Sequence, residues 1–135
     1  MLKPLPRRQR GLAAVELALV LPLLLLLLLA MIEYGTLFWR AQQIGNAARE
    51  GARAGIRATA TSGDVTAAVN AVMLAAGLDG SGFTTSLSAD PASLAPGAGL
   101  TVTVSVPYTA IDLTGFPVPA PTSVVRATTM AKEGS

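Results

Sequence analysis

The sequence predicts an α+β fold in which a long N-terminal transmembrane helix extends into a small domain with a short second helix and a three-stranded antiparallel sheet. The first observation is an apolar run, residues 12–39, with unbroken leucine at 23–29. The second is a series of good helix formers directly after it, at residues 40–58. The third is an alternation of apolar and hydroxyl side chains near the C-terminus, which is typical of half-buried strands.

The composition argues against an enzyme. The 135 residues include no cysteine and no histidine, which removes the commonest general base, the commonest metal ligand and every thiolate site. We therefore predict no enzymatic activity, no catalytic residue, no metal site and no cofactor. The acidic residues of the C-terminal part fall in predicted loops and caps without the spacing of a catalytic or metal-binding motif: Asp64, Asp79, Asp90 and Asp112.

The charge pattern is typical of a protein that flanks a membrane. The formal net charge is +2, but the basic residues gather at the start of the chain and acidic residues dominate after Arg57. A nucleic-acid-binding protein more often concentrates its basic residues on the folded domain, so we predict no nucleic-acid partner. The basic residues form two groups, Lys3, Arg7, Arg8 and Arg10 before the apolar run and Arg40, Arg49, Arg53 and Arg57 after it.

Residues 12–39 are predicted to form a transmembrane helix. The run exceeds the roughly 20 residues that a helix needs to cross a bilayer, and Tyr34, Phe38 and Trp39 suit the membrane–water interface. Pro22 removes one helix hydrogen bond and should bend the helix, which membrane helices tolerate. A cleaved secretory signal is the alternative, but no Ala-x-Ala-like site follows the leucines, so we expect the helix to be retained.

The helix is predicted to continue beyond the membrane over residues 40–60. Gly51 and Gly55 lie among alanines. They leave a smooth surface on which another element can pack closely, either from the same domain or from another subunit. A stripe of arginines recurs every four residues, with an acidic neighbour that can pair with either of its last two members: Arg49, Arg53 and Arg57, with Glu50.

Residues 61–135 are predicted to form a small helix followed by a β-meander. Ser62 or Asp64 is suited to cap the N-terminus of a helix over residues 65–76, and Gly77 resembles its C-cap. Three strands follow, at residues 83–89, 100–108 and 123–133. We expect them to form an antiparallel sheet that packs on the emerging half of the long helix.

A motif at the start of the apolar run resembles the processing site of type IV pilin-like precursors. A basic tail precedes Gly11, and Glu16 follows in the apolar helix, five residues after that glycine. The string AAVELALVLPLLLLLLLAMIEYGTLFWRAQQIGNAAREGARAG resembles the TadE family of the tight-adherence (Tad/Flp) pilus system, most closely over residues 10–58. The resemblance implies that a prepilin peptidase cleaves between Gly11 and Leu12, removing the basic leader 1–11 and retaining the helix.

Two acidic side chains lie within the apolar run. The resemblance implies that Glu16 pairs with the free amine of Leu12 on a neighbouring subunit. Such a pair would offset the roughly 2.5 kcal/mol or more that a charge costs at the membrane centre. Glu16 could instead lie near the interface and reach water. Glu33 is expected to snorkel to the opposite interface or to act as a cap, rather than to contact a partner.

The resemblance implies a pilin-like domain and a structural function, that of a minor pilin-like subunit or assembly factor for Tad/Flp pilus biogenesis and adhesion. The implied partners are the lipid bilayer, a prepilin peptidase, other pilin-like subunits and the Tad secretion and assembly machinery. The implied location is the cytoplasmic membrane in a single pass, with the N-terminus in the cytoplasm and residues 61–135 outside it. The alternative is an uncleaved single-pass anchor that presents a small extracytoplasmic binding or regulatory domain.

Overall fold

The computed structural model describes residues 7–115 and 118–134, with side chains from residue 11 onward. Residues 1–6 of the predicted leader lie outside the described residues. The predicted α+β class is confirmed, because one long helix precedes a short helix and a three-stranded sheet. The elements are α1 (Arg7–Gly55), α2 (Ser62–Ala75), β1 (Thr84–Leu87), β2 (Gly99–Pro107) and β3 (Ser123–Ala131), with 3-10 turns η1 (Pro91–Ser93) and η2 (Tyr108–Ala110).

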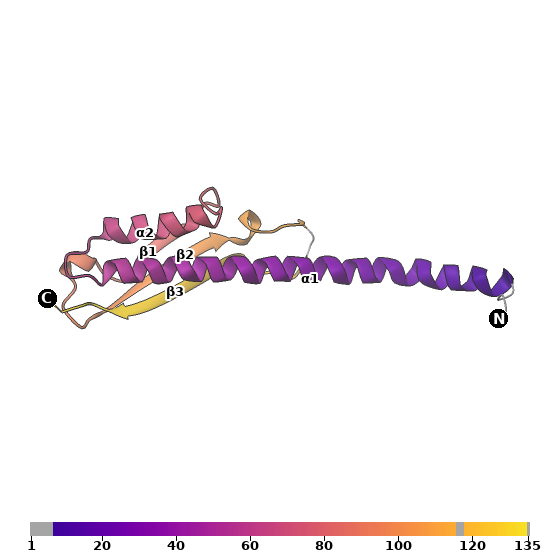
Figure 1. Ribbon diagram of the computed structural model, residues 1–135, viewed down its shortest axis with the longest axis horizontal. Coiled ribbons are helices and arrows are strands. Elements are labelled where there is room, and N and C mark those ends of the chain that lie inside the picture. The colour runs from indigo at the N-terminus through magenta and orange to yellow at the C-terminus, as the bar shows by residue number, and fades with distance from the viewer. Residues whose placement is uncertain (1–6, 116–117, 135) are drawn as a thin grey trace, which may run out of the picture.

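The three strands form an antiparallel sheet in the order β1-β2-β3, which confirms the predicted meander. In Figure 1 the second half of α1 runs along the sheet, and α2 lies beside α1. The side chains of the central strand that face the two helices are completely buried. They alternate with hydroxyl side chains as the sequence predicts, and they are Leu100, Val102, Val104 and Val106.

The core is thin because α1 contributes small residues to it. Ala47, Ala48 and Ala52 are completely buried beside Ile44. Small side chains let α2 and the sheet approach the backbone of α1, so branched residues from those elements fill the space. The core residues of α2 are Val65, Val69 and Met73.

The sequence located α2 well, but its N-cap prediction is wrong. Thr61, and not Ser62 or Asp64, is the N-cap, because its hydroxyl accepts the Asp64 backbone N–H. Asp64 completes a capping box by accepting the Thr61 backbone N–H at 2.8 Å. At the other end Gly77 has a φ of +67°. The Leu78 backbone N–H reaches past it to the Met73 carbonyl at 2.8 Å, which is a Schellman C-cap.

The end of α1 falls earlier than the predicted limit near residue 60. The helix ends at Gly55, and the Ile56 backbone N–H still bonds the Ala52 carbonyl at 3.1 Å. The Glu133 backbone N–H then donates to the Ile56 carbonyl at 2.8 Å. The chain that follows β3 therefore takes a carbonyl that a longer helix would have used for itself.

Candidate functional site

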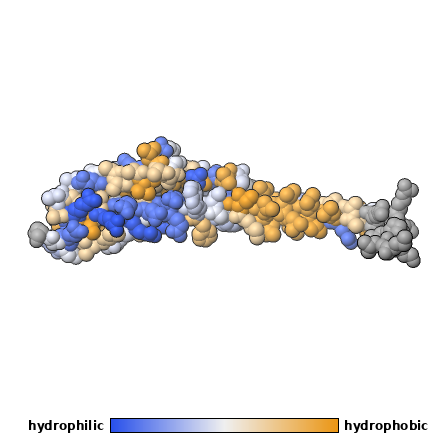
Figure 2. Space-filling view, viewed as in Figure 1, coloured by the Kyte–Doolittle hydropathy of each residue, from blue (hydrophilic) through white to orange (hydrophobic). Residues whose placement is uncertain are grey.

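The N-terminal part of α1 projects from the domain as a single free helix. Residues 11–28 are all exposed, and Figure 2 shows a largely hydrophobic surface over this projection. By length and composition the helix can cross a membrane, and the rest of the described chain buries none of its most apolar window. Residues 12–32 extend over about 31 Å at 1.5 Å per residue, which matches a hydrocarbon core of about 30 Å.

The predicted processing and pairing residues lie on this free helix. Gly11 is inside α1, and no side chain or other non-local atom lies within 4 Å of the position that a Cβ would take there. Leu12 is 65% exposed, and Glu16 is exposed one helical turn further on. The helix continues through Pro22 on both sides. The domain covers none of these four residues, so their surface is open to lipid or to another helix.

The predicted behaviour of Glu33 is wrong, because its carboxylate does not snorkel to water. Glu33 is 1% exposed and lies under the segment that follows β2. The Tyr108 hydroxyl and the Leu113 backbone N–H donate to Oε1, at 2.9 and 3.1 Å. The Thr114 backbone N–H and hydroxyl donate to Oε2, at 3.0 and 2.7 Å. Glu33 therefore joins α1 to the β2–β3 connection through four hydrogen bonds.

The Glu33 carboxylate and its donors form a cluster that we call the Glu33 clamp: Glu33, Tyr108, Leu113 and Thr114. Burial raises the pKa of Tyr108 to about 12, and the hydrogen bond to Glu33 acts in the same direction. The neutral phenol therefore stays a donor across the physiological pH range. The adjacent Tyr34 hydroxyl donates to the Pro119 carbonyl at 2.8 Å, which fastens the returning arm of the same connection.

The sequence does not identify the clamp, because Glu33 and its donors lie 75 to 81 residues apart in the chain. A carboxylate at the end of an apolar helix is compatible with snorkelling, capping or pairing. The fold alone brings the turn after β2 next to Glu33, where the apolar run ends. The available signal is weak: an acidic residue where the run ends, and a tyrosine directly after the clearest strand.

Gly51 and Gly55 lie where α1 meets α2 and the central strand of its own domain. A Cβ on Gly51 would lie 2.6 Å from Val69 Cγ2 and 3.2 Å from Val102 Cγ1. A Cβ on Gly55 would lie 2.4 Å from a Leu100 methyl group. Both glycines therefore permit a close approach that no other residue allows without a shift. Of the two packing partners left open by the sequence, the structure places the chain's own domain against them.

Lys132 is a buried cation that the sequence analysis missed. Its residue is 6% exposed, and its ammonium donates to the carbonyls of Arg57 at 2.6 Å and Pro91 at 2.9 Å, with a longer contact to Gly55 at 3.5 Å. The Gly55 carbonyl belongs to the last residue of α1 and the Arg57 carbonyl follows two residues later, so the ammonium lies at the C-terminal end of the helix, where a positive charge is favourable. Lys132 thus fastens the end of the chain to the end of the long helix.

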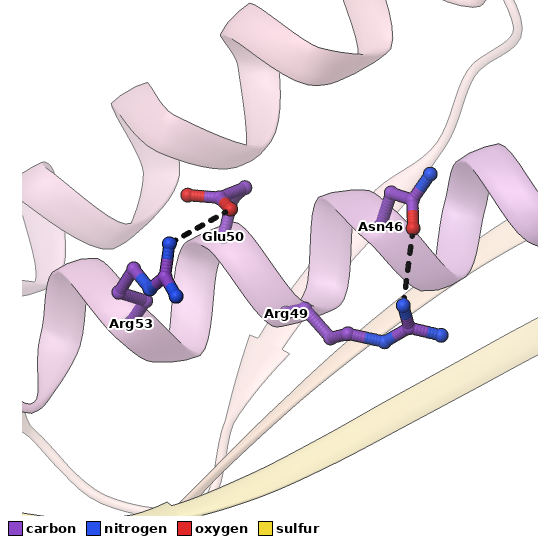
Figure 3. A network of polar contacts seen from close by, with 4 residues as sticks. All are labelled: Asn46, Arg49, Glu50 and Arg53. Atoms are coloured by element: carbon purple, nitrogen blue, oxygen red, sulfur yellow. Dashed lines mark hydrogen bonds and ion pairs between the residues drawn. The ribbon is translucent and has the colours of Figure 1, made fainter.

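Two members of the arginine stripe, Arg49 and Arg53, lie on α1 and contact neighbours on the same helix (Figure 3), whereas Arg57 follows the end of the helix. Arg53 pairs with Glu50 at 3.7 Å, one of the two pairings that the sequence predicts. Arg49 donates to the Asn46 side-chain oxygen at 3.2 Å. The ion pair is exposed on both sides, and such pairs contribute little to stability. The stripe is therefore a solvated face of the domain.

Two open grooves flank the helices. One, of about 360 Å³, lies between α1 and the start of β3 and is lined by Leu37, Phe38 and Val124 among others. The other, of about 490 Å³, lies beside α2 and is lined by Leu74, Asp79 and Phe83 among others. Within residues 7–115 and 118–134, no group of three or more acidic side chains is placed to hold a metal ion.

The similarity to a known protein family covers the free helix and its continuation in the domain. Residues 11–53 match the family model described as TadE-like protein. The match begins at the predicted processing glycine and ends two residues before α1 does. No curated protein and no solved structure gives a significant match to the chain.

Proposed function

We propose that this chain is a membrane-anchored pilin-like subunit or assembly factor for Tad/Flp pilus biogenesis and adhesion. Its residues 11–53 match the TadE-like family model, which confirms the predicted resemblance. One observation carries the proposal. A continuous helix of bilayer length projects uncovered from a small domain, which packs on the second half of α1. This shape is suited to lateral association of helices within a membrane or a filament.

The proposed processing step gives the free helix its assembly chemistry. Cleavage between Gly11 and Leu12 by a prepilin peptidase removes Lys3, Arg7, Arg8 and Arg10. It also creates an α-amine one helical turn from Glu16, about 6 Å along the axis at 1.5 Å per residue. A neighbouring subunit that is shifted by about one turn can then place its amine beside Glu16. Each charge would neutralise the other in a low-dielectric environment.

The proposed location follows from the same geometry. The basic leader favours a cytoplasmic N-terminus, so the domain formed by the end of α1 and residues 61–135 lies outside the cytoplasmic membrane. The partners we propose are lipid, a prepilin peptidase, other pilin-like subunits and the Tad secretion and assembly machinery. We propose no enzymatic role and no nucleic-acid partner, since the sequence has no histidine and no cysteine and carries only two basic residues after Arg57, which are Arg126 and Lys132.

A second function has support of its own. An uncleaved single-pass anchor that presents a binding or regulatory domain would use the groove between α1 and β3, which is lined by Leu37 and Phe38 directly above the apolar helix. The two functions differ at the N-terminus, since only the pilin-like function requires a mature chain that starts at Leu12.

Crosslinking within the membrane tests the proposed function. A photo-reactive residue at Leu19, which is 75% exposed, is introduced into wild type and into Glu16→Gln, in cells that express the whole Tad system. We expect wild type to crosslink to pilin-like subunits and Glu16→Gln to lose this product, because the partner's ammonium is left unpaired. Leu17→Ala, which keeps the carboxylate, is the control and should crosslink normally. Equal crosslinking and equal pilus formation by Glu16→Gln would contradict the pairing.

A further inference from the structure

We infer that the β2–β3 connection makes a second contact with the membrane. In this inference Leu113 and the other residues of the Glu33 clamp lie in the interfacial layer of the same bilayer that α1 crosses. The inference rests on the proposed insertion of α1. It adds that the domain does not stand clear of the lipid on its helix but touches the surface beside it.

The level of the bilayer surface along α1 follows from the length of the free helix. Residues 12–32 cover about the thickness of the hydrocarbon core, so residues 33–39 fall in the interfacial layer. Three aromatic residues on this short segment are exposed, as expected of side chains at that depth. They are Tyr34 at 38%, Phe38 at 68% and Trp39 at 56%.

The Glu33 clamp fixes the β2–β3 connection at the same level. Leu113 and Thr114 donate their backbone N–H groups to the Glu33 carboxylate, and Pro119 accepts from the Tyr34 hydroxyl. Both arms of the connection are therefore fastened to consecutive residues of α1. The connection cannot move along the helix away from the bilayer without breaking these hydrogen bonds.

The exposed surface of the connection has the chemistry of a membrane contact. Leu113 is 55% exposed although its backbone is fastened to a buried carboxylate. Residues 113–123 contain no charged side chain. Asp112, the neighbour of Leu113, is exposed and would meet the headgroups, so the contact is shallow. The Glu33 carboxylate is not exposed to the lipid, because it is buried and accepts four hydrogen bonds from the chain itself.

Spin labels on single cysteines test the inference, since the chain has no cysteine of its own. The full-length protein is reconstituted into vesicles of phosphatidylcholine and phosphatidylglycerol, with one label at position 25, 113 or 67. Collision with oxygen, which concentrates in lipid, is compared with collision with a water-soluble nickel chelate. Ala67 is the aqueous reference, because it is exposed on α2 and lies far from the predicted bilayer surface. Its neighbours Val65 and Val69 lie against Gly51, and Gly51 is about 27 Å along α1 from Glu33.

We expect the oxygen-to-nickel collision ratio to be highest for Leu25→Cys, intermediate for Leu113→Cys and lowest for Ala67→Cys. Adding Glu33→Gln should shift the ratio at position 113 towards that of Ala67→Cys, because an amide cannot accept all four clamp hydrogen bonds. The spectrum of the label at position 67 should stay unchanged and show that the domain is folded.

Each contrary result has its own meaning. A low ratio for Leu25→Cys would overturn the proposed insertion of α1. A high ratio for Leu25→Cys with equal ratios at positions 113 and 67 would overturn the loop contact alone. Protection of position 113 from both oxygen and nickel would also overturn it, because a second copy of the chain would then cover Leu113.

Discussion

Gly51 gives the sharpest test of how the domain is packed on α1. In Gly51→Ala the new methyl group would lie 2.6 Å from Val69 Cγ2, 3.2 Å from Val102 Cγ1 and 3.4 Å from Val65 Cγ1. These atoms belong to short, branched side chains that are completely buried in the core, so they have no room to move away from the new methyl group. Overpacking of this kind costs about 1–3 kcal/mol. Alanine also favours a helix over glycine by about 1 kcal/mol, which offsets part of that cost.

A matched glycine-to-alanine substitution on the same helix separates the overpacking cost from the gain in helix propensity. A Cβ on Gly45 would meet only Arg126 Cγ at 3.9 Å and atoms at 4.0 Å, which are ordinary contacts. Gly45→Ala should therefore stabilise the protein by about 0.5–1 kcal/mol. Because both substitutions gain the same helix propensity, their free energies of unfolding should differ by the overpacking cost, about 1–3 kcal/mol.

The assay is pulse proteolysis of the full-length chain in detergent across a urea gradient, which reports the folded fraction of the domain. We expect the order of stability Gly45→Ala, then wild type, then Gly51→Ala. Gly51→Leu should be less stable still. Equal stability of the two alanine variants would refute the close approach of α2 and β2 to α1 at Gly51.

Three further predictions concern the hydrogen bonds made by Lys132, Asp64 and Glu33. Lys132→Met should lower the free energy of unfolding by about 1–3 kcal/mol, because the carbonyls of Arg57 and Pro91 lose their donor; the same assay measures it, and exposed Arg53→Met is a control that should change little. Hydrogen bonds from the Thr61 backbone and hydroxyl hold the pKa of Asp64 below its usual value of 3.8. The contribution of Asp64 to stability is therefore complete above that value and is lost as the pH falls through the folded-state pKa. Thermal unfolding should show Asp64→Asn less stable than wild type at pH 7 and the difference shrinking at acid pH; a constant difference would refute the cap. Glu33→Ala should speed hydrogen exchange at the Leu113 and Thr114 amides, and unchanged exchange would refute the clamp.

The elements that the sequence predicted well are those encoded by local patterns. The apolar run sets the free helix, and the alternation from Leu100 to Val106 sets which face of β2 is buried. Gly77 predicts its own left-handed conformation, because a non-glycine residue rarely adopts it. The N-cap prediction failed between near-equivalent candidates, since Thr61, Ser62 and Asp64 all carry side chains that can cap.

The parts that the sequence did not predict depend on contacts between distant residues. Lys132 and Glu33 are charged and would be assigned to the surface by residue type alone. Each is buried because the sheet returns the chain to α1 and offers backbone carbonyls to one and donors to the other. Likewise, the small residues around Gly51 and Gly55 predict close packing but do not identify the element that packs there.

The mass of the N-terminal peptide of the mature protein tests the central claim most directly. Membranes are prepared from cells that express the chain with an active prepilin peptidase and from matched cells with an inactive one. We predict a peptide that begins at Leu12 only in the first preparation, and full-length protein in the second. Retention of residues 1–11 in both preparations would contradict the pilin-like account and favour the uncleaved anchor.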